Sequence, residues 1–281
     1  RRAAGWRTIS AMAGDARAAM VEQSYVSLLE RARSPLMRRM PDTDVLLYLS
    51  DLPIPICSGA LAPHFAAGQE RRRAGEALDV LFGNGQPFQW WSGPLSSSEV
   101  AEEVVRERGL VTEGLTPGMH ADLALVSLPN PSSTVRVQQC VGPEEWLEAN
   151  RVFARAFSLP LDFADPFVEI LGSVDGVIQL SARLDGEVVG CAAGAMRDGV
   201  MGVYNVGTLE PARRRGVGRA LTAELMRIGR DRGAHSTILH ASEMGYPVYL
   251  GLGFEHVTDV SQYFWLPPAG RPTGPTAGPD D

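Results

Sequence analysis

One stretch of the sequence, VGTLEPARRRGVGRA at residues 206–220, decides the organisation of the second half of the chain. It begins as an apolar run, passes through a turn of arginines and glycines, and continues with Val217, Leu221 and Leu225 on one helical face. The first N–H groups of a helix have no intrahelical partner, and the helix dipole adds positive charge there. Gly216 and Gly218 carry no Cβ and let a ligand approach the backbone. The stretch therefore predicts a strand, a turn and a helix that together bind an anion such as a pyrophosphate.

The elements around this stretch form one α/β unit. We expect a strand at 135–140, helices at 144–157 and 163–172, and then three strands that end with the one entering the turn. Asp185-Gly186 and Asp198-Gly199 separate these strands and predict tight hairpins, so the sheet begins antiparallel. After the helix that starts at Val217 we expect a strand at 237–241, a short helix at 245–252 and a closing strand or hairpin at 255–266.

The first half of the chain repeats this order more faintly. It predicts a helix at 71–82, a strand at 88–91, a helix at 98–108 and a strand region that ends at Leu128-Pro129. The turn-rich segment 128–133 separates the halves, which predicts a degenerate copy at 1–130 and a complete one at 131–267. An unrelated α/β lid over the second half is the alternative. Residues 268–281 alternate proline and glycine and predict a disordered tail.

Composition excludes several classes of protein. The chain has 281 residues, 44% of them apolar, enough for two ordinary cores, and a net charge of −7 that argues against binding nucleic acid. All 26 basic residues are arginine, so a P-loop, a pyridoxal enzyme and a Schiff-base aldolase are excluded. The three cysteines lie far apart and the five histidines form no ligand motif, so we expect no metal. No apolar run approaches the roughly 20 residues of a membrane span, and we expect a cytoplasmic protein without a membrane partner.

Two families use a glycine turn of this kind, and the residues distinguish them. A dinucleotide-binding fingerprint needs a third glycine where this chain has Leu221. Arg-x-x-Gly-x-Gly at 213–218 instead resembles the acetyl-CoA signature of the GCN5-related N-acetyltransferase (GNAT) superfamily. Tyr249, four residues before Gly253-Phe254, is similar to a second feature of that family, and the run 241–254 looks like actinobacterial members with two such halves. The resemblance implies the GNAT fold: a mixed, centrally splayed sheet flanked by helices, here preceded by a degenerate GNAT-like half.

The resemblance also implies a cosubstrate, acetyl-CoA, and no metal. In the family the strand before the turn carries a bulge and separates from the next strand, so its backbone pairs with the pantetheine arm and one N–H, near Val206 or Gly207, holds the oxyanion. Ser242 stands where many relatives have asparagine. The residues expected to bind acetyl-CoA are Val206, Gly207, Thr208, Arg213, Arg214, Arg215, Gly216, Val217, Gly218, Arg219, Ser242 and Tyr249.

The resemblance points to a catalytic acid but not to a single catalytic base. The resemblance implies that Tyr249, a phenol with an ordinary pKa of about 10, protonates the leaving thiolate. Many relatives place a base, a glutamate, on the strand before the turn, but residues 199–204 hold no carboxylate. Glu210 and Glu243 are the nearest acids in sequence, and either could act through a water or be solvated only. Glu210 also departs from the family pattern, which has proline in its place.

The sequence thus predicts an N-acetyltransferase that moves an acetyl group from acetyl-CoA to a primary amine of a small molecule, by direct attack in a ternary complex. The first half lacks Arg-x-x-Gly-x-Gly and is expected to bind no CoA. A catalytically silent acyl-CoA sensor or assembly protein is the alternative, and a nicotinamide enzyme is disfavoured by Leu221. The sequence does not decide the oligomeric state, and a homodimer is one of the options.

Overall fold

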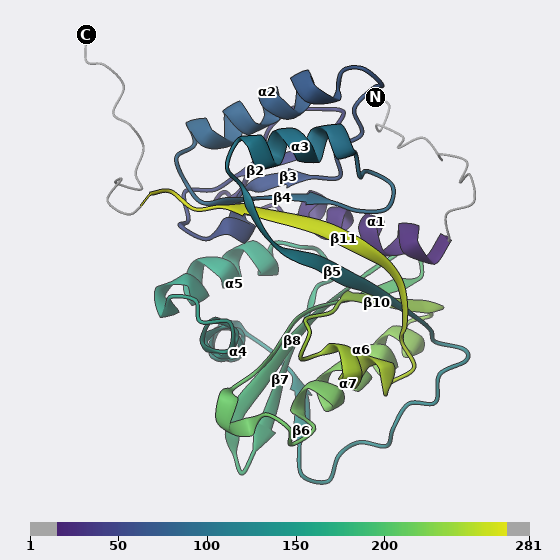
Figure 1. Cartoon of the computed structure of the whole chain (residues 1–281). Coiled ribbons are helices and arrows are strands. Elements are labelled where there is room, and N and C mark those ends of the chain that lie inside the picture. The colour runs from purple at the N-terminus through teal and green to yellow at the C-terminus, as the bar shows by residue number, and fades with distance from the viewer. Residues whose placement is uncertain (1–15, 269–281) are drawn as a thin grey trace.

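The strands form one mixed sheet in the order β1-β2-β3-β4-β11-β5-β10-β9-β8-β7-β6 (Figure 1). The computed structural model describes residues 16–268, so all but the first residue of the predicted tail at 268–281 lies outside the described residues. No helix within 16–268 is long and apolar enough to cross a membrane. The strands are β1 (Arg38–Arg39), β2 (Leu46–Leu49), β3 (Gly59–Leu61), β4 (Phe88–Ser92), β5 (Val111–Asp122), β6 (Arg136–Gln139), β7 (Ile178–Leu184), β8 (Glu187–Arg197), β9 (Val200–Thr208), β10 (Ser236–His240) and β11 (Glu255–Trp265).

Helices lie on both faces of this sheet (Figure 1). One apolar core joins α1, α4 and α5 to one face of the sheet, and a second joins α6 and α7 to the other face of β8, β9 and β10. A third core lies under α2 and α3. The helices are α1 (Ala16–Arg31), α2 (Glu70–Gly83), α3 (Glu99–Glu107), α4 (Pro143–Ala156), α5 (Ala164–Gly172), α6 (Val217–Asp231) and α7 (Tyr246–Leu250), with short 3-10 turns η1 (Pro55–Cys57), η2 (Leu161–Phe163) and η3 (Glu210–Ala212).

Both predicted hairpins are confirmed. Strand β7 pairs antiparallel with β8, and β8 with β9. Asp185 and Asp198 have φ of 52° and 50°, and the glycines that follow them also have positive φ. Aspartate and glycine tolerate this left-handed backbone better than other residues, which is why Asp-Gly locates both turns in the sequence.

The same order of elements occurs twice. In the second half, β9 leads through α6 to the parallel strand β10, then to α7 and the long strand β11. In the first half, β3 leads through α2 to the parallel strand β4, then to α3 and the long strand β5. The predicted helices and strands of both halves are present, with ends within three residues of those expected, except that the strand region before Leu128-Pro129 ends at Asp122.

The two halves exchange their last strands. Strand β5 pairs antiparallel with β10 of the second half, and β11 pairs antiparallel with β4 of the first half. The two exchanged strands also pair with each other at the centre of the sheet. The strands of each half are therefore completed by a strand from the other half. The division into domains at 1–130 and 131–267 stays a prediction.

Strand β8 and helix α6 approach closely at two glycines. A Cβ on Gly190 would lie 2.3 Å from Val217 Cγ1, and one on Gly194 would lie 2.7 Å from Leu225 Cδ2. Val217 is the first residue of α6, so this contact fixes where the helix begins against the sheet. Glycine in β8 therefore positions the turn that precedes α6.

Replacing Gly190 with valine should lower the free energy of unfolding by about 1–3 kcal/mol, because overpacking forces backbone shifts. We expect a lower thermal midpoint, measured by circular dichroism. Gly75→Ala is the control, because a Cβ at Gly75 in α2 meets no atom within 4 Å. An unchanged midpoint for Gly190→Val would contradict the close packing of α6 on β8.

Candidate active site

Strands β9 and β10 separate along their length. They pair in parallel from Val200 to Val203 of β9, and β9 then continues to Thr208 without a partner on that side among the described residues. His240, the last residue of β10, keeps its pairing with Gly118 of β5 on the other edge but has no partner in β9. The backbone edge of residues 204–208 is therefore open to a ligand that pairs as another strand would. The splayed sheet expected from the sequence is confirmed.

A bulge in β9 begins this gap. Between the pairs Ala193–Tyr204 and Cys191–Gly207, β9 contains one residue more than β8. Asn205 in the bulge has φ of 54°, and its carbonyl lies 3.6 Å from Cys191 Sγ. A bulge turns the following backbone groups out of the regular ladder, here toward the gap.

The glycine turn, residues 213–218, lies at the end of β9. Gly216 has φ of +81°, and a Cβ there would meet no atom within 4 Å, so the space in front of the turn is open. Within the described residues, no backbone N–H from 214 to 219 donates to a backbone carbonyl; the first such bond of α6 joins Ala220 to Gly216. A Cβ on Gly218 would lie 3.8 Å from Val206 Cγ1 and 3.9 Å from Thr208 Oγ1. The structure thus brings the turn and the end of β9 together.

Four arginines lie in or directly after the turn, and two of them donate to backbone carbonyls. Arg213 donates through Nε to the carbonyl of Thr208 at 3.4 Å, and Arg219 donates to the carbonyl of Gly251, after α7, at 3.0 Å. The other two are exposed: Arg215 lies 3.4 Å from Asp185, and Arg214 has no partner among the described residues. Free N–H groups, a helix N-terminus and exposed guanidinium groups fit a pyrophosphate.

Tyr249 in α7 lies on the same face of the sheet as α6. It is 7% exposed and shares an apolar core with Val206 and Ala241, which belong to the two sides of the gap. Its hydroxyl makes no hydrogen bond within the described residues, and burial raises its pKa to about 12. A neutral phenol with a free hydroxyl is suited to donating a proton.

The remaining predicted residues, Ser242, Glu210 and Glu243, make few or no contacts with the other described residues of the site. Ser242 Oγ accepts a hydrogen bond from the N–H of Gly245 at 3.2 Å and so supports the start of α7. Glu210 in η3 and Glu243 before α7 are exposed, and neither carboxylate pairs with any residue the structure describes. The structure therefore brings neither acid to another group of the site.

The opposite face of the gap contains residues that the sequence did not single out as functional. His240 ends β10 on this face, and its ring contacts that of Tyr25 of α1. Tyr25 also contacts Tyr204 of β9. One signal could have indicated His240: a polar side chain at the carboxyl end of a strand beside the ligand turn, where α/β sheets bind ligands. In the described part of the chain, no group of three or more histidine, cysteine or acidic residues could hold a metal ion.

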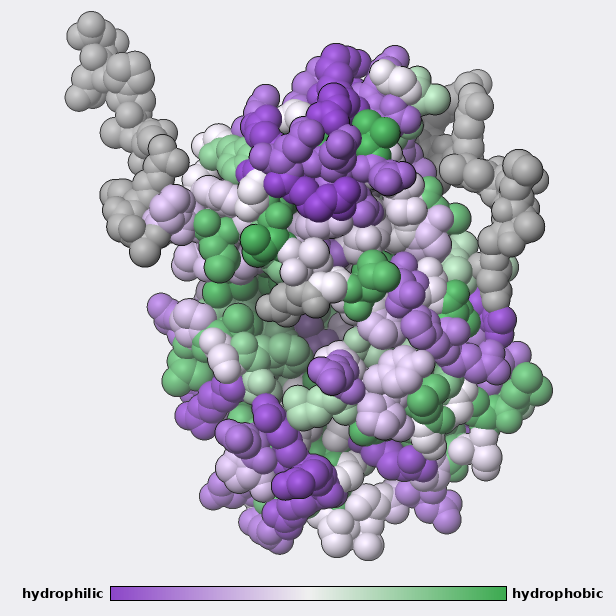
Figure 2. All heavy atoms as spheres, in the orientation of Figure 1, coloured by the Kyte–Doolittle hydropathy of each residue, from purple (hydrophilic) through white to green (hydrophobic). Residues whose placement is uncertain are grey.

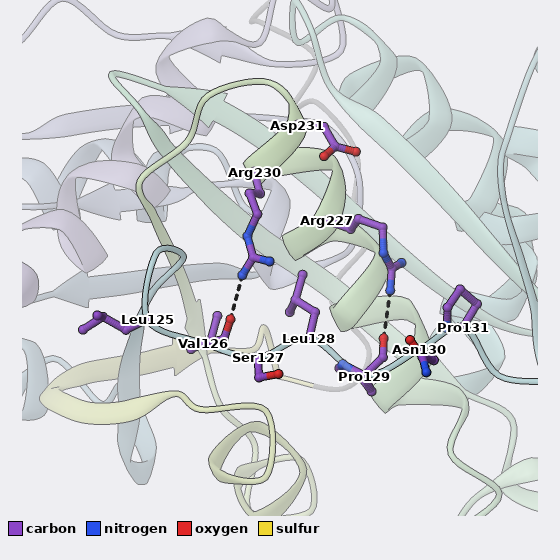
Figure 3. A pocket seen from close by; sticks show the side chains of 10 residues that line it. All are labelled: Leu125, Val126, Ser127, Leu128, Pro129, Asn130, Pro131, Arg227, Arg230 and Asp231. Atoms are coloured by element: carbon purple, nitrogen blue, oxygen red, sulfur yellow. Dashed lines mark hydrogen bonds between the residues drawn. The ribbon is translucent and has the colours of Figure 1, made fainter.

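A separate pocket lies near the carboxyl end of α6 (Figure 3). It is lined by the connection 125–131 and by three residues of α6. Arg227 donates to the carbonyl of Pro129 at 3.0 Å, and Arg230 to that of Val126 at 2.8 Å. These arginines hold the connection against α6, about 20 Å from the glycine turn along a helix of 15 residues.

Comparisons with known proteins agree with this geometry. Residues 144–254 match the Acetyltransferase (GNAT) family model. No curated protein matches the chain in sequence. Among solved structures, a GCN5-related N-acetyltransferase from Kribbella flavida is 20% identical, with a TM-score of 0.69 over 92% of this chain and 98% of that one.

Two further structures share the fold. A GCN5-related N-acetyltransferase from Sphaerobacter thermophilus is 16% identical, with a TM-score of 0.60 over 82% of this chain and 83% of its own. A tandem GNAT protein from the clavulanic acid biosynthesis pathway is 14% identical, with a TM-score of 0.56 over 91% and 89%. Residues 144–254 thus match the GNAT acetyltransferase family model, within a fold that these GNAT structures share over most of the chain.

Proposed function

We propose that the protein is an acetyl-CoA-dependent N-acetyltransferase that acetylates a primary amine of a small molecule by direct attack in a ternary complex. The gap between β9 and β10, with the open glycine turn at its end, is the observation that carries the proposal. When bound, acetyl-CoA supplies an activated acyl thioester. We also propose that the protein is cytoplasmic and does not bind nucleic acid, and its net charge of −7 supports the second point.

Each part of the site has one task in this proposal. The free N–H groups of the glycine turn bind the pyrophosphate, and the edge of residues 204–208 orients the pantetheine arm. A backbone N–H near Val206 or Gly207 stabilises the negative charge that develops on the carbonyl oxygen. Tyr249 donates its hydroxyl proton to the sulfur as the carbon–sulfur bond breaks.

One observation favours the alternative, a silent acyl-CoA sensor. Strand β9 holds no carboxylate, and both Glu210 and Glu243 are exposed and unpaired among the described residues. A protein that kept the glycine turn but had no base would bind acetyl-CoA without turnover.

Calorimetric titration with acetyl-CoA, followed by a thiol-release assay against a panel of primary amines, separates the two functions. Binding with amine-dependent thiol release is the result we expect. Binding with no release for any amine would favour the sensor. Failure to bind acetyl-CoA would contradict both functions, and with them the assignment of the glycine turn.

A further inference from the structure

An aromatic cluster surrounds His240 on the face of the gap opposite Tyr249. The imidazole lies edge-on to Tyr25 of α1, with ring centroids 5.6 Å apart, and to Trp91 of β4 at 5.5 Å. Tyr25 in turn lies 6.4 Å from Tyr204, the first residue of β9 beyond its pairing with β10. We call Tyr25, Trp91 and Tyr204 the aromatic wall.

Hydrogen bonds hold this wall in place. The hydroxyl of Tyr204 lies 2.6 Å from Ser24 Oγ on α1, and Gln89 of β4 donates to the hydroxyl of Tyr25 at 3.2 Å. Gln89 also donates to the hydroxyl of Tyr48 at 2.6 Å. Segments of both halves of the chain are thus connected around one histidine.

The Nε2 atom of His240 is buried and has no hydrogen-bond partner among the described residues, although the residue as a whole is partly exposed. Such an atom normally has a partner, so a missing one points to a ligand or a water. Burial lowers the pKa of His240 to about 4, which keeps the imidazole neutral near pH 7. The titratable group in ring contact with it is Tyr25, whose pKa burial raises, so the phenol also stays neutral near pH 7.

We propose, on the basis of the acetyltransferase function above, that His240 is the base of the reaction and that a primary amine on an aromatic or apolar body packs against Tyr25, the partly exposed member of the aromatic wall. Nε2 accepts a proton from the acceptor nitrogen while that nitrogen bonds to the acyl carbon. The electrons of the carbon–sulfur bond pass to sulfur, which takes the proton of Tyr249. The proton on His240 then returns to Tyr249 through solvent, so no group is consumed.

The position of His240 suits this step. It lies where the two strands part, on the face with α1 and α4, whereas Tyr249 lies on the face with α6 and α7. Base and acid are therefore on opposite sides of the thioester site. Negative charge that develops on the carbonyl oxygen favours the protonated imidazole, which opposes the effect of burial on the pKa of His240.

The described residues beside His240 suggest the class of acceptor. The aromatic wall has no charged side chain, which disfavours a polyamine or a basic peptide. Phe157, 49% exposed after α4, has a ring atom 3.5 Å from where a Cβ on Gly207 would lie, so it adds exposed apolar surface beside β9. Apolar residues gather over α4 and α5 on the surface as well (Figure 2). Flat apolar amines fit these surroundings best.

The test compares kcat for thiol release in the full-length protein and in His240→Ala. We expect kcat to fall by about 10²- to 10⁴-fold, with acetyl-CoA affinity unchanged by calorimetry and activity partly restored by added imidazole. His235→Ala, at the start of the same strand region, is the matched control and should retain wild-type kcat. His240→Gln, close in size but without a basic nitrogen, should fold, stay inactive and show no imidazole rescue.

The remaining outcomes are distinguishable. No thiol release by the wild-type protein with any amine overturns the proposed function, and this inference with it. An active wild type with unchanged kcat in His240→Ala, or full activity in His240→Gln, overturns only the role of His240. For the acceptor class, we expect kcat/KM for 2-phenylethylamine to exceed that for spermidine by at least about tenfold, a difference of 1.4 kcal/mol; the reverse order would overturn it.

Discussion

Tyr249→Phe is expected to lower kcat by about 10²- to 10⁴-fold, the usual contribution of a general acid. The hydroxyl makes no hydrogen bond within the described residues, so its removal should leave the thermal midpoint and acetyl-CoA affinity unchanged. Burial raises the pKa of Tyr249 to about 12. The phenol is therefore protonated throughout the neutral range, and the wild-type rate should show no decline from this group below about pH 11.

Tyr246→Phe provides the matched control. It removes a hydroxyl from the same short helix, but that hydroxyl lies 3.4 Å from His256 Nδ1, away from the gap. Steady-state kinetics at saturating acetyl-CoA would compare the two variants. Equal kcat values for Tyr249→Phe and the wild-type protein would show that Tyr249 only packs against α6 and Phe254.

Gly218→Asp is expected to weaken acetyl-CoA binding by about 10²- to 10³-fold. A carboxylate about 4 Å from a phosphate charge costs about 4 kcal/mol near a protein surface, and each 1.4 kcal/mol is tenfold in Kd. The fold should tolerate the change, because a Cβ on Gly218 meets its nearest atom at 3.8 Å and aspartate is favourable in the first turn of a helix.

Calorimetry with acetyl-CoA measures this effect directly. Gly75→Asp in α2 makes the same change of charge at a position where a Cβ meets nothing within 4 Å, and it should leave Kd unchanged. Wild-type affinity in Gly218→Asp would mean that the pyrophosphate binds elsewhere. Equal weakening in both variants would show a general effect of net charge rather than a local one.

The sequence alone predicted the elements of the second half because their signals are local. The two Asp-Gly turns need positive φ, α6 has an apolar face with a 3.6-residue period, and Gly216 marks where that helix starts. The family resemblance at 213–218 and at Tyr249 is also carried by short spacings, and the match over 144–254 agrees with it. Local patterns therefore located the glycine turn and predicted that it binds an anion.

Only the tertiary structure decided the centre of the sheet and the acceptor side of the gap. The exchange of β5 and β11 depends on pairing between residues more than 100 positions apart, which no local pattern encodes. The position of His240 at the end of a strand is visible in the sequence, but its environment is not: Tyr25 and Trp91, from the other half of the chain, enclose it, and Nε2 has no partner among the described residues. Burial, and with it the pKa of a side chain, is a property of what packs around a residue, so the sequence located the glycine turn while only the fold determined the surroundings of His240.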